Sequence, residues 1–157
     1  MPMTQDDLIA ARTAWGDELL AIAKAFEDGG IDAARAVANG VLDEAYGYDL
    51  GPVLFKPTLS GGPQTFRTTK AGALSYFVAH DDTYPDDTGF AIRPWRDVQY
   101  KEAASFIEGD VGMWMGSAFF TDKDGNVTQA DKTFGYKKDA DGNVKVVLHH
   151  SSLPYAA

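Results

Sequence analysis

The last strand-like segment of the chain carries the side chains that enzymes use most. Residues 146–155 read VVLHHSSLPY, so a run with strand composition ends in two histidines and two serines. Successive side chains of a strand point to opposite faces, and His149 and His150 must therefore face apart. A serine nucleophile needs a base on its hydroxyl and a third group that orients the base. His149 and Ser151 form only a same-face pair, without a third group to orient the base, and we therefore expect hydrogen bonding at the strand end.

Metal-binding patterns are weak in this sequence. Neighbouring histidines on a strand do not chelate one ion easily, and neither HxH nor HExxH spacing occurs. His80 precedes four aspartates within seven residues, but a solvated acidic loop is the commoner meaning of such a run. The chain has no cysteine, which excludes thiolate zinc sites, disulfides and cysteine nucleophiles. We expect neither a metal nor a cofactor.

Composition limits the possible partners. With 157 residues, 45% hydrophobic and 24% charged, the chain has the size and make-up of one globular domain spanning residues 1–157. A formal charge of −9 argues against nucleic acid and against anionic lipid surfaces. The acidic N-terminus shows no signal peptide, and no apolar run approaches the length of a membrane span. We expect a cytoplasmic protein.

The N-terminal half has helical periodicity. Thr4, with Asp7 three residues later, is a typical helix start, and Gly29-Gly30 ends that helix. A second amphipathic helix begins at Asp32, and a third is expected over about 69–80. Between them, PVLFKPTL and TFRTT have the composition of short strands around the turn SGGP.

The C-terminal half has the composition of a sheet. Four strands are expected at 97–108, 110–122, 126–138 and 143–151. The turns DKDGN and DADGN join the last three, and Asp-Gly between strand-like runs is a strong hairpin signal. Helices followed by a meander predict an α+β fold, with N-terminal helices packed on a long curved antiparallel sheet.

Three-residue loops at both Asp-Gly turns would fix the strand register. Trp114 then lies across from Phe134, Lys132 across from His150, and Tyr136 across from Val146. The resulting face is an apolar, aromatic floor with a cation and an imidazole at its edge, as in many small-molecule sites. Its members are Trp114, Phe134, Tyr136, Leu148, Lys132 and His150, and Tyr46, Lys56 and Arg67 are candidates near the pocket mouth. A shift of one residue would exchange His149 and His150.

This arrangement, closing on VVLHHSSLP, resembles the nuclear transport factor 2-like superfamily, which includes ketosteroid isomerase and the SnoaL-like cyclases. The closing motif is most similar to the association domain of calcium/calmodulin-dependent protein kinase II and its bacterial relatives. The resemblance implies a cone-like α+β barrel with a deep pocket, paired as a homodimer through the sheet. It places His149 at the family histidine and His150 at an arginine that projects into the pocket.

Shorter segments, VLFKPTL, RTT, GALSYFV and DKTFGY, also resemble a bacterial subgroup sometimes labelled phosphoribosyl-AMP cyclohydrolase. That enzyme resembles a cysteine-liganded zinc protein, and a chain without cysteine does not fit it. The isomerase's catalytic carboxylate is not identifiable either. The kinase modules cluster arginines in the pocket, whereas the candidates in this chain are His150 and Lys132.

Three functional hypotheses remain open from the sequence. The first is a homodimer that binds a small, partly apolar molecule with an anionic or carbonyl group, held by Lys132 and His150. The second is an enzyme of isomerase, cyclase or dehydratase type, with His150 as acid/base and Tyr136 or Lys132 stabilising negative charge. The third is an oligomerisation module without chemistry. The sequence alone does not decide whether the protein is an enzyme.

Overall fold

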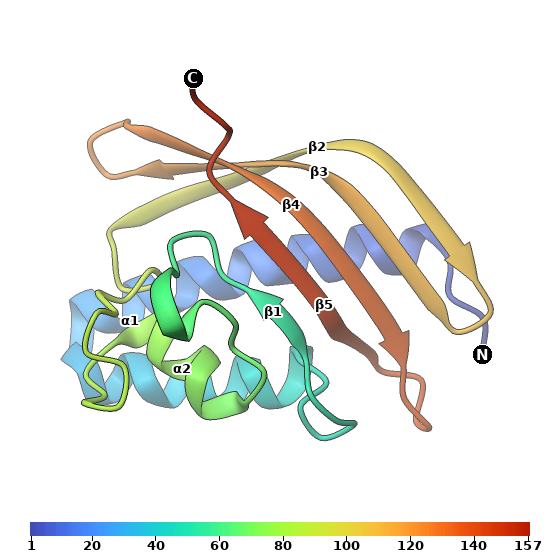
Figure 1. The fold of residues 1–157 in the computed structure, drawn as a ribbon, viewed down its shortest axis with the longest axis horizontal. Helices are drawn as coiled ribbons and strands as arrows, with labels where there is room; N and C mark the ends of the chain where they lie inside the picture. Colours follow the sequence, from blue (N-terminus) through green and yellow to red (C-terminus); the bar gives the residue numbers. More distant parts are fainter.

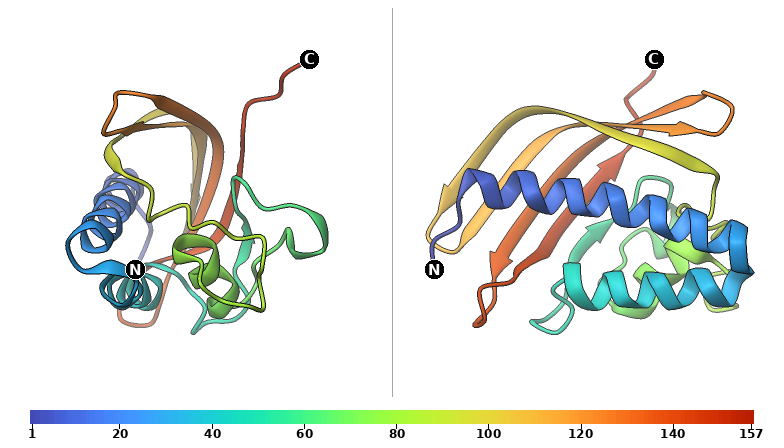
Figure 2. Two further views of the ribbon diagram at one scale, coloured as in Figure 1. Left: turned by 90° about the vertical axis from the view of Figure 1, so that its left-hand side faces the viewer. Right: turned by 180° about the vertical axis from the view of Figure 1, so that it is seen from behind.

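The computed structural model describes all residues from 1 to 157. The chain forms α1 (Gln5–Ala45), β1 (Leu54–Lys56), a short 3-10 helix (Gly62–Gln64), α2 (Lys70–Val78), β2 (Trp95–Glu108), β3 (Val111–Asp122), β4 (Val127–Lys138) and β5 (Val144–Ser152). The strand order is β1-β5-β4-β3-β2, with β1 parallel to β5 and the other pairs antiparallel (Figure 1). Both helices lie on one side of the curved sheet, and its other face is uncovered (Figure 2). The fold is α+β as expected, although the sheet stays open instead of closing into a barrel.

Helix α1 contains the two N-terminal helices predicted from the sequence. Thr4 and Asp7 form a reciprocal capping box, in which each side chain accepts from the other's backbone N–H. At Gly30 the backbone leaves the helical region with φ of 78°, a value that glycine adopts without strain. The chain reverses there, so the two halves of α1 run back along each other (Figure 2). Leu8, Trp15 and Leu19 are among the residues that α1 buries in the core.

The two Asp-Gly hairpins have the predicted three-residue loops. The N–H of Asp122 donates to the carbonyl of Asn126, and that of Asp139 donates to Asn143. Gly125 and Gly142 have φ of 83° and 84°, as such loops require. The pairing of β3 with β4 is therefore the predicted one, with Trp114 opposite Phe134 and Gly116 opposite Lys132.

A bulge changes the register between β4 and β5. Tyr136 pairs with Val146 as predicted, but the next residue back on β4, Gly135, pairs with Leu148. One extra residue on β5, Val147, opposes no residue of β4, so every later side chain of β5 changes face. The predicted pairings of Phe134 with Leu148 and of Lys132 with His150 are therefore wrong. Phe134 lies opposite His149, and Lys132 lies opposite Ser151.

The segment between the helices is less regular than predicted. Only three residues form β1, which pairs along β5 so that Phe55 lies beside His149. TFRTT does not form a strand; its one link to β1 is the N–H of Arg67, which donates to the carbonyl of Phe55.

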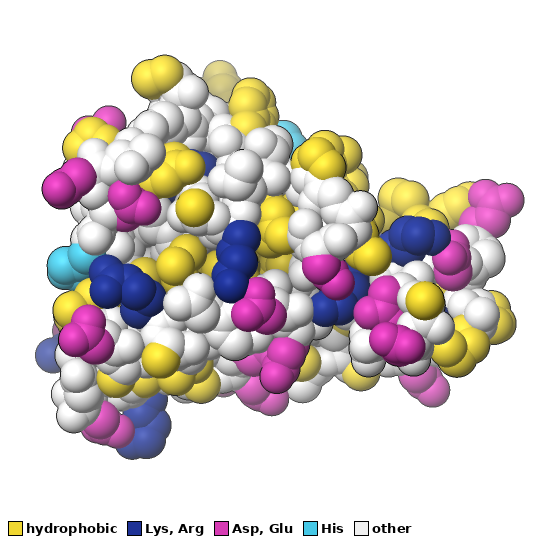
Figure 3. All heavy atoms as spheres, turned by 90° about the horizontal axis from the view of Figure 1, so that it is seen from below, with side chains coloured by type: hydrophobic (Ala, Val, Ile, Leu, Met, Phe, Trp, Pro, Cys, Tyr) yellow, Lys and Arg dark blue, Asp and Glu magenta, His cyan; other side chains and the backbone are white.

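Charged side chains of both signs are dispersed over the face seen in Figure 3. None of the helices combines the length and the hydropathy that crossing a membrane requires.

Candidate functional site

The bulge in β5 turns His149 and Ser151 into the interior and leaves His150 outside. His149 is 1% exposed and Ser151 0%, whereas His150 is exposed. His150 borders a hollow on the outer face of the sheet, beside Met115 and Thr133. The expectation that His150 points into the pocket is therefore wrong, because the extra residue in β5 was not anticipated.

His149 lies in an aromatic sandwich between two neighbouring strands. The rings of Phe55 and Phe134 stack on its two faces, with centroids 4.6 and 4.0 Å away. Its Nδ1 is 2.8 Å from the hydroxyl of Tyr46, and its Nε2 is 2.8 Å from Nζ of Lys132. Burial, followed by the charges of Lys132 and His150, lowers the pKa of His149 well below its ordinary value. The imidazole is therefore neutral at neutral pH.

Lys132 is the second unusual group of this interior. It is 3% exposed, and its only hydrogen-bond partner is Nε2 of His149. Its Nζ lies over the ring of Trp15, 4.6 Å from the centroid. Burial lowers the pKa of Lys132 to about 7, so amine and ammonium are both populated near neutral pH. A buried lysine of this kind can accept or release a proton at physiological pH.

Trp15, Tyr46, His149 and Lys132 form one hydrogen-bonded network. Which group donates and which accepts determines where its protons lie. Trp15 has only an N–H, which donates to the hydroxyl of Tyr46 over 2.9 Å. When Lys132 is a neutral amine, both ring nitrogens of His149 and the hydroxyl of Tyr46 are paired if Tyr46 donates to Nδ1 of His149 and Nε2–H donates to Lys132. When Lys132 is an ammonium, it must donate to Nε2, so the ring proton moves to Nδ1 and points at Tyr46. The hydroxyl hydrogen of Tyr46 then needs another acceptor.

Three hydroxyl groups gather next to this network. Oγ1 of Thr58, just after β1, is 2.6 Å from Oγ of Ser151, and Lys56 donates to the Ser151 carbonyl over 2.9 Å. Tyr76 of α2 accepts from the N–H of Leu59 over 3.1 Å. Burial raises the pKa of Tyr76 to about 12, which keeps its phenol protonated. Thr58, Tyr76 and Ser151, called here the hydroxyl cluster, are all buried.

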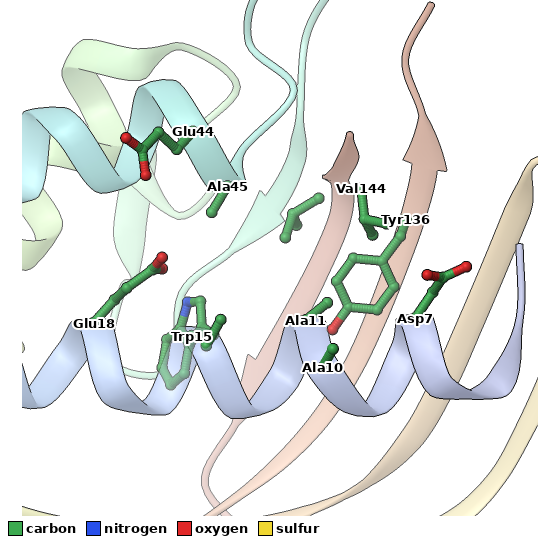
Figure 4. A pocket seen from close by; sticks show the side chains of 11 residues that line it. Asp7, Ala10, Ala11, Trp15, Glu18, Glu44, Ala45, Tyr136 and Val144 are labelled. Atoms are coloured by element: carbon green, nitrogen blue, oxygen red, sulfur yellow. The ribbon is translucent and has the colours of Figure 1, made fainter. Parts of the chain in front are cut away.

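Two cavities lie beside these groups. A cavity of about 30 Å³ is lined by Leu59, Tyr76, Phe90 and Arg93, among others, which gives room for roughly two water-sized molecules. A larger cleft of about 330 Å³ opens between the two halves of α1 and strands β4 and β5. Figure 4 shows Trp15 and Tyr136 on its walls, with the carboxylates of Glu18 and Glu44 pointing toward each other. Tyr76 is the member of the hydroxyl cluster that lines the small cavity, and Asp86 and Asp87 line it as well.

The residues expected around the pocket divide into two groups. Lys132, Phe134, Tyr46 and Lys56 contact His149 or Ser151, and Tyr136 lines the larger cleft. The others lie elsewhere. Trp114 donates to the hydroxyl of Tyr136 within the core, Leu148 covers Gly135 on the outer face, and Arg67 is held by Asp87 in a buried ion pair of 2.7 Å.

Four important residues were not predicted as site residues: His149, Ser151, Thr58 and Tyr76. The alternation of β5 allowed either histidine to face inward, and only the bulge decides between them. Thr58 and Tyr76 stand within VLFKPTL and GALSYFV, two of the segments that resembled a bacterial subgroup. Those segments were a usable signal, but no spacing rule brings Thr58 and Tyr76 to the end of β5. In the structure, no group of three or more His, Cys, Asp or Glu side chains is placed to hold a metal ion.

Comparisons with known proteins give consistent matches. The family model described as metal-independent carbonic anhydrase matches residues 6–153. A metal-independent carbonic anhydrase from Nostoc sp. (strain PCC 7120) is 50% identical over 153 residues, which cover 98% of this chain and 75% of the relative. The crystal structure of a cyanobacterial iota-carbonic anhydrase complexed with bicarbonate is 49% identical, with a TM-score of 0.98, and the match covers 99% of this chain and 95% of that one.

More distant structures share the fold. A protein from Xanthomonas campestris, described as a calcium/calmodulin-dependent protein kinase II association domain, has a TM-score of 0.58 at 22% identity. That match covers 95% of this chain and 87% of the other. Nuclear transport factor 2-like proteins also match. The resemblance to both groups is thus confirmed for the fold.

Proposed function

Because the chain belongs to the metal-independent carbonic anhydrase family, we propose that it interconverts carbon dioxide and bicarbonate at the hydroxyl cluster. The proposal draws on the relatives named above, one of which holds bicarbonate. It replaces the general expectation of a small anionic or carbonyl-bearing ligand with a specific one.

The observation that carries this proposal is the position of the hydroxyl cluster next to the Lys132–His149 pair. Ser151 is the direct cross-strand partner of Lys132, and it shares the inner face of β5 with His149. Side chains paired in this way have Cβ atoms about 5 Å apart. The hydroxyl cluster, which can donate to a developing anion, and the Lys132–His149 pair, which can accept a proton, are therefore close enough to contact the same small molecule.

The chemistry needs one proton acceptor and several hydrogen-bond donors. On hydration, an O–H bond of water breaks while its oxygen bonds to the carbon of carbon dioxide, and a C=O electron pair moves onto oxygen. Hydroxyl donors from Thr58, Tyr76 and Ser151 stabilise the negative charge of the forming bicarbonate. The Lys132–His149 pair takes up the proton of water, and the ammonium so formed lies near the anion.

The test compares two neighbouring serines. Ser151→Ala removes an inward donor, whereas Ser152→Ala changes a residue that lies on the opposite face of β5. In a stopped-flow assay of carbon dioxide hydration with chelator-treated protein, we expect Ser151→Ala to lower kcat/KM about 100-fold, the usual effect of losing one such donor. Ser152→Ala should retain wild-type activity. Equal activities for all three proteins would refute the proposal.

We also propose, as the sequence led us to expect, that two copies of the chain pair through the outer face of the sheet. Phe106 and Met115 are 61% and 58% exposed there, and Met113 lies directly across from Phe106. Large apolar side chains on an uncovered sheet face are typical of interfaces. Light scattering on the purified protein should give twice the chain mass, and Met115→Glu should give the monomer. A monomeric wild type would contradict this.

A further inference from the structure

The proposed acceptor of the proton is buried, so the proton needs a route to solvent. Hydration of carbon dioxide releases one proton per turnover, and Lys132, His149 and Tyr46 are all nearly inaccessible. Nζ of Lys132 has no hydrogen-bond partner except His149. A group that contacts both this network and solvent must therefore exchange protons with it.

Strand β5 places the network between the hydroxyl cluster and the larger cleft. Its inward-facing side chains include, in order, Val146, His149 and Ser151. Val146 lines the larger cleft, His149 belongs to the network, and Ser151 belongs to the hydroxyl cluster. On the cleft side, Trp15 lines the cleft and donates to Tyr46, whose backbone pairs with Val146. Tyr46 is therefore the member of the network nearest the cleft.

Glu18 is the ionisable group of the cleft that lies beside Trp15. It stands one helical turn after Trp15 on α1, and its carboxylate points into the cleft (Figure 4). Its Oε2 atom is buried and has no hydrogen-bond partner. Buried polar atoms are almost always satisfied, so this oxygen needs a water molecule or a proton of its own. The cleft, about 330 Å³, has room for bridging waters.

The surroundings of Glu18 favour its protonated form. Asp7 and Glu44 line the same cleft with Tyr136, Asp17 precedes Glu18 on the helix, and no lysine or arginine lines the cleft. Burial, followed by the charges of Glu44 and Asp17, raises the pKa of Glu18 to about 7. The negative charge of Glu18 contributes in turn to raising the pKa of Tyr46. Glu18 and Lys132 can therefore exchange a proton near neutral pH at little cost.

We propose that Glu18 carries the proton between the buried network and solvent, an inference that rests on the function proposed above. When Lys132 is an ammonium, the hydrogen of Tyr46 has no acceptor in the network, and a water leading to Glu18 supplies one. Three protons then shift: from Lys132 to Nε2 of His149, from Nδ1 to Tyr46, and from Tyr46 through water to Glu18. Lys132 is again a neutral amine, and a buffer base removes the proton from Glu18.

The test separates proton transfer from the chemical step. Glu18→Gln keeps the shape of the side chain but removes its titration, and Glu27→Gln, an exposed glutamate of the same helix, is the matched control. Because kcat includes proton release and kcat/KM does not, we expect Glu18→Gln to lower kcat about tenfold, to leave kcat/KM unchanged, and to recover kcat in millimolar imidazole buffer. Glu27→Gln should match the wild type in both parameters.

Two kinds of outcome would refute the role of Glu18, and one of them would also refute the proposed function. If kcat of Glu18→Gln equals that of the wild type, or if kcat/KM falls in the same proportion, Glu18 does not carry the proton. An inactive wild type would instead refute the carbonic anhydrase function, and the role of Glu18 with it. The two failures are distinguishable because the first requires an active wild-type protein.

Discussion

Nζ of Lys132 lies 2.8 Å from Nε2 of His149 on the inner face of the sheet, and both side chains are almost completely buried. The pair has no carboxylate partner, and burial lowers the pKa of both groups, so the imidazole is neutral at neutral pH while the amine and ammonium forms of Lys132 are both populated. When the amine accepts a proton, the ring proton of His149 moves from Nε2 to Nδ1, and the hydroxyl hydrogen of Tyr46 turns to another acceptor.

The two adjacent histidines provide a direct test of the bulge. His149→Gln should lower carbon dioxide hydration about 100-fold, because it removes the group that links Lys132 to Tyr46. His150→Gln should stay within about twofold of the wild type, because that side chain lies on the outer face. Stopped-flow assays of both variants, with circular dichroism to check folding, measure this. Loss of activity in His150→Gln alone would restore the register expected from the sequence.

Activity should depend on a base that titrates near neutral pH. Since the pKa of Lys132 is lowered to about 7, kcat/KM for hydration should rise as pH increases through 7 and then level off. Lys132→Met should remove both the activity and this titration. A pH profile of kcat/KM from 5.5 to 9 measures the effect, and a profile that is flat through pH 7 would exclude Lys132 as the base.

Lys132 also affects stability, in a direction that follows from its pKa. An unfolded lysine titrates near 10.5, so between about pH 7 and 10.5 the unfolded chain binds a proton that the folded chain does not. The contribution of Lys132 to stability is therefore greatest above pH 10.5, and it is lost as pH falls through 7. Urea unfolding at pH 7 and pH 9 should show a larger gain with pH for the wild type than for Lys132→Met. Equal gains would mean that Lys132 is charged in the fold.

Glu18 has the opposite effect on stability. Its carboxyl titrates near 7 in the fold and near 4.5 when unfolded, so its contribution is complete below pH 4.5 and is lost as pH rises through 7. Glu18→Gln should therefore stabilise the protein at pH 8, by about 1 kcal/mol after allowance for solvent screening, or a few degrees in Tm. Thermal melts at pH 5 and pH 8 measure this. A destabilised variant at pH 8 would show that the charged carboxylate is favourable in the cleft.

Arg67 is predicted to support the fold rather than to bind ligand. Both of its terminal nitrogens bond to Asp87, which also accepts from Ser75, and the ion pair is almost completely buried. Arg67→Met leaves a buried carboxylate unpaired and should cost about 3–5 kcal/mol. The double variant Arg67→Met/Asp87→Leu should recover part of that loss in urea unfolding. A single variant as stable as the wild type would contradict a structural role.

Patterns along the chain were sufficient to predict the architecture. The capping box at Thr4, the break at Gly30 and the two Asp-Gly loops are local signals, and each formed the predicted structure. Which residues form the site depended instead on a bulge and on a strand pairing between distant parts of the chain. A single extra residue, Val147, reversed which histidine faces inward, and no local pattern marks it. Thr58 and Tyr76 reach Ser151 only because β1 pairs with β5 in parallel, a pairing that the sequence did not suggest.

A crystal structure of this protein soaked in bicarbonate would test directly whether the hydroxyl cluster is the active site. The anion should lie within hydrogen-bond distance of the hydroxyl groups of Thr58, Tyr76 and Ser151, on the Lys132 side of β5. Bicarbonate bound instead in the larger cleft beside Tyr136, or on the outer face beside His150, would contradict it.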